Sequence, residues 1–178
     1  MSFFKKIFGG EESQGLAETA QSSGGGSHKA IKFGRYTDCN KTKEQVKYWN
    51  ESVDKFKAKA YVDSFEAFMH YLRDVEVDNV HVSREGDVVS FEVIQGSKII
   101  RGQGDADKFW AEANIVKMDS SSLPVMRKLM SLNYTLRYSK FALKDNILCM
   151  KFSSHAIDAS PNKLYDALKE LARKADQQ

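Results

Sequence analysis

Residues 79–118 constrain the fold most strongly, because short turn sequences divide them into strand-forming segments. Arg-Glu-Gly-Asp separates residues 79–83 from residues 88–95, and Gly-Ser-Lys separates the latter from residues 99–103. A fourth segment, residues 109–118, has apolar side chains at alternate positions, which is typical of a strand. Strands joined by connections this short pair antiparallel. The stretch therefore predicts an antiparallel meander.

Two helical stripes precede the meander. Each has apolar side chains three or four positions apart: Val46, Trp49, Val53 and Phe56, then Tyr61, Phe65, Phe68 and Leu72. The five-residue step between the stripes would turn the apolar face of a continuous helix away, so we predict a turn near residues 57–60 and a helical hairpin. Because the turn residues are Lys and Ala, one kinked helix is the alternative.

A helix, a hairpin and a second helix follow the meander. Ser120 to Ser122 and Pro124 are typical of a helix start, and this helix has an apolar side made of Val125, Met126, Leu129, Met130 and Leu132. Residues 134–152 predict two strands around a polar turn, and Pro161 predicts the start of a last helix striped by leucines.

This order predicts the α+β class: an antiparallel sheet of about five strands with helices packed on one face, preceded by a helical hairpin and a flexible tail. We assign residues 1–30 to the tail, residues 31–74 to the hairpin and residues 75–178 to an α+β domain.

The first eight residues predict a docking tip. Phe3, Phe4, Ile7 and Phe8 have helical spacing, and Lys5 and Lys6 point elsewhere. A polar stretch rich in Gly, Ser and Gln then predicts a tether. We expect the tip to make a weak contact with a membrane surface, or to enter a groove on a partner or on its own domain. A frayed end is the alternative.

Composition excludes several classes of protein. The chain has 178 residues and a net charge of +3, which is too weak to indicate a nucleic-acid-binding protein. Cys39 and Cys149 match no zinc or redox spacing. No apolar run approaches the roughly 18 residues of a membrane span, and the start of the sequence lacks a signal-peptide core. We expect a cytoplasmic protein, with the tip allowing peripheral contact with the inner membrane.

The order of elements resembles the type III secretion chaperone-like fold and, within it, the YbjN-like family of bacterial proteins. The resemblance covers residues 75–175 and rests on the run VMRKLMSLNYTLRYSKFALKDNILCMKFSSHAIDASPNKLYDALKELARKAD. It implies a non-enzymatic, chaperone-like module that binds a protein partner and often pairs as a homodimer.

No catalytic or metal-binding constellation is evident. Cys149 lies inside a predicted strand, and His155 has no evident third partner, so a buried thiol is the favoured interpretation. His70 has no second ligand at helical spacing, and we expect it to be packed or half-exposed. We interpret the run Gly102-Gln-Gly104-Asp-Ala-Asp107 as a strand-end turn, not as a nucleotide loop or cation site. We predict no enzyme, no cofactor and no metal.

Both faces of the predicted strands carry apolar groups, which predicts a partner-binding face in addition to the core. Its candidate residues are Trp110, Val116, Tyr138, Ile147 and Cys149. We expect it to bind a second copy of the domain or a segment of another protein, whose identity the sequence does not give. In the alternative arrangement, the helical hairpin covers this face.

Nucleic acid is the rival class of partner. Residues 127–151 contain six Lys and Arg and one Asp, a local charge of +5, together with three aromatic residues that can stack on bases. Charge on solvated strand edges is the commoner cause of this pattern, so nucleic acid is the less favoured partner.

Overall fold

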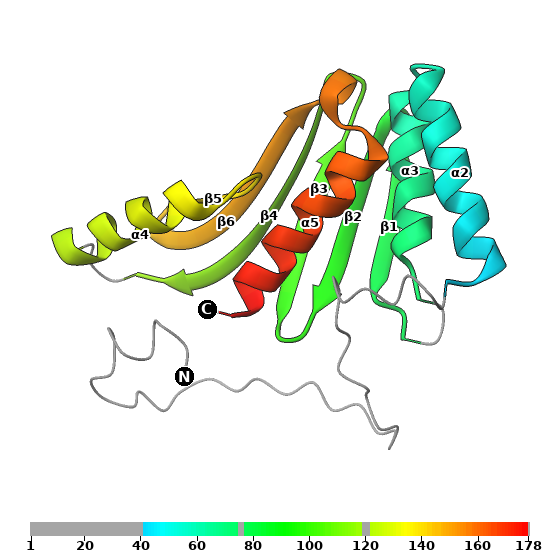
Figure 1. The fold of residues 1–178 in the computed structure, drawn as a ribbon. Coiled ribbons are helices and arrows are strands. Elements are labelled where there is room, and N and C mark those ends of the chain that lie inside the picture. The colour runs from blue at the N-terminus through cyan, green and yellow to red at the C-terminus, as the bar shows by residue number, and fades with distance from the viewer. Residues whose placement is uncertain (1–40, 75–76, 119–121, 178) are drawn as a thin grey trace.

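The computed structural model describes residues 41–74, 77–118 and 122–177, which form one β-sheet with four α-helices packed on it (Figure 1). In chain order the elements are α2 (Lys43–Lys57), α3 (Tyr61–Leu72), β1 (Val80–Glu85), β2 (Val88–Gln95), β3 (Lys98–Gly104), β4 (Lys108–Lys117), α4 (Leu123–Thr135), β5 (Lys140–Lys144), β6 (Ile147–His155), the 3-10 turn η2 (Ala156–Asp158) and α5 (Pro161–Asp176).

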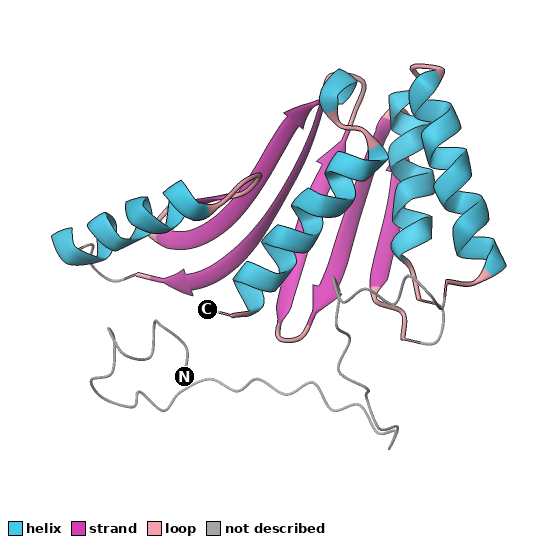
Figure 2. Ribbon diagram, in the orientation of Figure 1, coloured by secondary structure: helices cyan, strands magenta, loops and turns pink. Residues whose placement is uncertain are grey.

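The sheet has six strands in the order β1-β2-β3-β4-β6-β5, and every neighbouring pair is antiparallel. Helices cover one face of it (Figure 2). The predicted α+β class and antiparallel sheet are confirmed, with six strands in place of about five. Burial alternates strictly along β2, as expected of a sheet with one covered and one water-facing side.

The helical hairpin forms where the break in the apolar stripe predicts it. Thr42 begins α2 with a capping box, in which its hydroxyl accepts from the Gln45 backbone N–H and the Gln45 side chain accepts from the Thr42 N–H, both at 3.1 Å. Lys59, with a φ of 64°, makes the turn. Between the helices, the buried hydroxyls of Ser52 and Ser64 each donate to the other residue's carbonyl, at 2.9 and 2.8 Å.

The hairpin packs on the same face of the sheet as α5. The ring of Phe65 in α3 lies 5.1 Å from that of Phe109 in β4, and the ring of Trp49 in α2 lies 6.4 Å from that of Tyr165 in α5. One hydrophobic core therefore joins the hairpin to the sheet. The alternative arrangement, in which the hairpin covers the second sheet face, is wrong.

Two glycines of β3 make room for the aromatic part of the core. A Cβ on Gly104 would lie 2.5 Å from the ring of Phe65, and a Cβ on Gly102 would overlap the ring of Phe91. The predicted strand-end turn begins later than Gly102, because this glycine lies inside β3, Gly104 is the last residue of the strand, and both are buried.

Helix α4 continues further than the sequence pattern predicts. Tyr134 belongs to its last turn and not to a strand, and β5 begins only at Lys140. The buried residues of α4 are Val125 and Leu129. The predicted placement of Met130 on the packed side is wrong, because this side chain is 73% exposed.

Residues 1–40, and with them the predicted docking tip Phe3, Phe4, Ile7 and Phe8, lie outside the described residues. Within the described ranges, no helix combines the length and the apolar composition that crossing a bilayer requires.

Candidate partner-binding face

The face of the sheet opposite the helices carries a row of five charged side chains and one histidine, here called the charge ladder. Strand pairing places its members side by side in the order His81, Glu92, Arg101, Glu112, Lys151 and Lys140. Arg101 Nε lies 2.7 Å from Glu92 Oε1, and Glu112 lies 3.7 Å from Lys144 Nζ and 3.9 Å from Lys151 Nζ. Opposite charges on neighbouring strands stabilise the pairing and keep this face in water.

Trp110 stands in the row beside the charge ladder. Its strand neighbours are Gln103 and Ser153, and Gln103 donates from its side-chain amide to Ser90 Oγ at 3.1 Å. Trp110 is half-buried and borders a shallow, open concavity of about 480 Å³ lined by residues of β1 to β4. A large aromatic side chain within a polar surface is typical of a protein contact site.

Three of the five predicted partner-binding residues lie on this open face. Trp110 alternates with the buried side chains of β4, and Ile147 and Cys149 share the parity of Lys151 in β6. Trp110 pairs with Ser153, so Cys149 lies four residues away along β6, or roughly 13 Å. The open face thus has an aromatic region at Trp110 and a separate region at Ile147, while Cys149 lies on the same side of the sheet but is buried and offers no surface to a partner.

The structure places the other two candidates elsewhere. A bulge between Asn114 and Val116 shifts the register, so that Val116 pairs with Leu148 of the buried row. Tyr138 lies in the connection between α4 and β5, where its backbone N–H donates to Glu170 of α5 at 3.0 Å. Period-two alternation cannot reveal a bulge, which is why the sequence pattern groups Val116 with the open face.

Cys149 is suited to packing and not to nucleophilic chemistry. It is 2% exposed, and its thiol lies 3.5 Å from the carbonyl oxygen of Ala142. Burial raises the pKa of this thiol and the charge of Glu112 adds to the rise, while Lys151 and Lys144 act in the opposite sense. The protonated thiol therefore dominates at neutral pH, and it is a poor nucleophile.

The histidines considered as catalytic or metal-binding groups do not assemble a site. Cys149 and His155 are six residues apart on the same strand, which separates them by roughly 20 Å, so they cannot act as a dyad. The ring of His70 packs 5.2 Å from that of Tyr48, within the helical hairpin.

Asp105 and Asp107 form a turn and not a cation site. The Asp105 carboxylate accepts hydrogen bonds from the backbone N–H groups of Asp107 and Lys108, both at 2.8 Å, which is an Asx-type turn. Within residues 41–74, 77–118 and 122–177, no group of three or more His, Cys, Asp or Glu side chains is placed to hold a metal ion.

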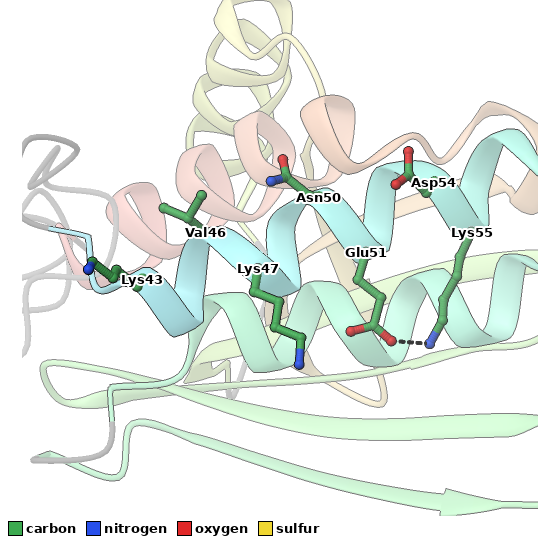
Figure 3. Close-up of a pocket in the computed structure, with 7 residues that line it drawn as sticks. All are labelled: Lys43, Val46, Lys47, Asn50, Glu51, Asp54 and Lys55. Carbon is green, nitrogen blue, oxygen red and sulfur yellow. Dashed lines mark ion pairs between the residues drawn. The ribbon is translucent and has the colours of Figure 1, made fainter.

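A shallow groove along the outer side of α2 is the surface of a solvated helix. Figure 3 shows its lining residues, which include 46%-exposed Val46 and the ion pair between Lys55 and Glu51. That pair is 2.6 Å long, and its hydrogen bond lowers the pKa of Glu51. Pairs at this helical spacing are common on solvated helices, so nothing here indicates a ligand.

The outer side of α4 carries exposed apolar residues that the sequence pattern does not predict. Leu123, Met130 and Tyr134 are 62%, 73% and 92% exposed. Three exposed cations accompany them on α4 and the following connection: Arg127, Lys128 and Arg137. We call these six residues the α4 surface. The spacing of Leu123, Met130 and Tyr134, seven and then four residues, could have revealed this surface in the sequence. It places the three apolar residues on one line of the helix, apart from Val125 and Leu129.

The likeness of this chain to known proteins is distant and structural. No family model matches the chain, and no curated protein matches it. Among solved structures, a chain of the ExsC–ExsE complex, a type III secretion chaperone complex, is similar at a TM-score of 0.37 and 13% identity, over 67% of this chain and 89% of that chain. At this TM-score the likeness carries no argument about function, and membership of the YbjN-like family remains a prediction.

Proposed function

We propose that this protein is a non-enzymatic, chaperone-like module that binds a protein partner on the open face of its sheet. The observation that carries this proposal is the position of Trp110. Every described α-helix lies on the other side of the sheet (Figure 2), and the open face holds this half-buried aromatic side chain beside a shallow concavity. Aromatic side chains in such positions are frequent energetic centres of protein interfaces.

The charges of the open face favour a protein over a polyanion as the partner. The charge ladder contains both signs, and Arg101 and Lys151 are each placed within 4.0 Å of a glutamate. A nucleic acid would meet these carboxylates as well as the cations, whereas a protein segment can present charges of both signs. The same face is compatible with a second copy of the chain, because a two-fold contact buries one patch against itself.

Site-specific photo-crosslinking in cells tests this function. A benzoylphenylalanine residue replaces Gln103 or Ser153, the two strand neighbours of Trp110. We expect discrete protein adducts from both positions, including adducts with a second copy if the chain pairs. Adding Trp110→Glu should remove them, because a charge in the contact is costly to desolvate.

The matched control places the same cross-linker at Asp166, an exposed position of α5 on the covered side of the sheet. It should give none of the discrete adducts. The proposal fails if Gln103 and Ser153 give no protein adducts, or if Asp166 gives the same ones.

A further inference from the structure

The α4 surface is separate from the open face and combines two properties that rarely occur together at an exposed site. Its apolar side chains, Leu123, Met130 and Tyr134, are among the most exposed large hydrophobic residues of the described chain. They lie on the opposite side of α4 from Val125 and Leu129, which are buried. The helix is thus apolar on two sides, and the protein's own core uses one of them.

The charge around this apolar row has one sign. Residues 122–139 contain three Lys and Arg and no Asp or Glu. All three cationic residues, Arg127, Lys128 and Arg137, are exposed. The open face differs in this respect, because its charge ladder contains both signs.

We propose that the α4 surface binds an anionic lipid bilayer. The helix would lie in the plane of the interface, with Leu123, Met130 and Tyr134 entering the boundary between headgroups and acyl chains. The surrounding cations would meet the lipid phosphates and carboxylates. A second copy of the chain is a poor occupant, since it would place three cations against three.

A second part of the sequence has the same chemistry and favours a bilayer over a protein groove. Residues 2–8 contain four large apolar side chains and two lysines, with no Asp or Glu. The 32 residues from 9 to 40 can span roughly 100 Å when extended, so both elements can reach one planar surface. A bilayer accepts both at once, whereas a protein partner would need a separate acidic groove for each.

Flotation with lipid vesicles tests the proposal on the full chain. The protein should bind vesicles of equal parts phosphatidylserine and phosphatidylcholine, and it should ignore vesicles of phosphatidylcholine alone. Leu123→Gln with Met130→Gln and Tyr134→Gln should reduce binding by roughly tenfold or more. Arg127→Gln with Arg137→Gln should have an effect of similar size, and added salt should weaken binding.

Two controls match these changes in exposure and charge. Ile157→Gln removes a 66%-exposed apolar side chain beyond the α4 surface, and Lys57→Gln removes an exposed cation of α2. Both should bind anionic vesicles like the wild-type protein. Trp110→Glu should also leave vesicle binding unchanged, so failure of this inference is distinct from failure of the proposed function.

Three results would overturn the inference. The first is a wild-type protein that ignores anionic vesicles, whether or not the same cations bind a single-stranded RNA oligonucleotide. The second is an equal loss of binding in Ile157→Gln and in the triple apolar variant. The third is complete loss on deletion of residues 1–10 while both α4 variants bind like the wild-type protein.

Discussion

The hydroxyl of Ser139 donates a 2.6 Å hydrogen bond to Oε1 of Glu170, and the backbone N–H of Ser139 donates another, at 2.8 Å, to the same oxygen. The carboxylate also accepts from the backbone N–H groups of Arg137, at 2.9 Å, and Tyr138, at 3.0 Å. One side chain of α5 thus accepts hydrogen bonds from three successive backbone N–H groups in the connection from α4 to the edge strand β5.

This arrangement predicts a loss of stability in acid. Burial alone would raise the pKa of Glu170, but the hydrogen bonds from Ser139, Arg137 and Tyr138 outweigh it and hold the pKa below the ordinary value of 4.5. A depressed folded-state pKa means that the contribution is complete above about pH 4.5 and decreases as the pH falls through the folded-state value. Urea unfolding across this range should show that decrease, and Glu170→Gln should make the pH dependence shallower.

Glu170→Ala leaves several backbone donors without their acceptor and should cost about 1–3 kcal/mol at neutral pH. Asp166→Ala, one turn earlier on the exposed side of α5, is the matched control and should be nearly neutral. Equal stability of the two variants would show that water replaces the carboxylate without cost.

Gly104→Ala should destabilise the fold by about 1–3 kcal/mol, because the added methyl group overlaps the ring of Phe65. Phe65→Leu in the same chain should recover part of that loss, since a smaller side chain leaves room for the methyl group. Urea unfolding of the two single variants and the double variant measures the coupling. Strictly additive losses would mean that the ring is not what excludes a side chain at this position.

Cys149 should react slowly with a thiol reagent. A Cys39→Ser background leaves Cys149 as the one thiol of the 178-residue chain. Because this thiol is 2% exposed and its pKa lies above the ordinary value of 9.0, native labelling at neutral pH should be at least roughly a hundredfold slower than labelling in denaturant. Labelling at the rate of a small-molecule thiol would refute the buried, protonated state.

Trp110→Glu tests whether the open face pairs two chains. If it does, the wild-type protein should sediment as a dimer at micromolar concentration, and the variant should be a folded monomer weakened in pairing by at least roughly a hundredfold. Ile157→Glu, at a 66%-exposed site, should still pair. A wild-type protein that remains monomeric removes the homodimer and leaves other proteins as the partner.

Much of the fold was predictable from local patterns. The meander, the hairpin turn near Lys59 and the helix from Pro161 depend on apolar spacing and on turn or cap residues within a few positions, and all three form. The length of α4 was not predictable in the same way. Near Tyr134, side chains spaced for a helix also alternate roughly as in a strand, so the local pattern is ambiguous. The connection after the helix is held by hydrogen bonds to Glu170, which lies more than thirty positions later in the chain.

The candidate site was predictable only in part, for a related reason. Trp110 follows from simple alternation along an uninterrupted strand, and the structure places it on the open face. The position of Val116 depends on a bulge that the sequence pattern does not reveal. The exposure of Met130 depends on how few elements contact α4, since the sheet covers only one side of this helix. Exposure depends on which neighbours are present, and a single helical stripe does not encode them.

The charge ladder has a consequence for the accuracy of folding. A slip of one residue in a strand pairing would carry the core side chains to water, so the apolar pattern alone excludes it. A slip of two residues keeps the apolar pattern, but it would remove Arg101 from between Glu92 and Glu112 and place it opposite uncharged neighbours. Each cross-strand charge pair contributes roughly 0.2–1 kcal/mol. Three of the ladder's pairings, Glu92–Arg101, Arg101–Glu112 and Glu112–Lys151, join opposite charges, and together they discriminate against the shifted sheets that the core would otherwise tolerate.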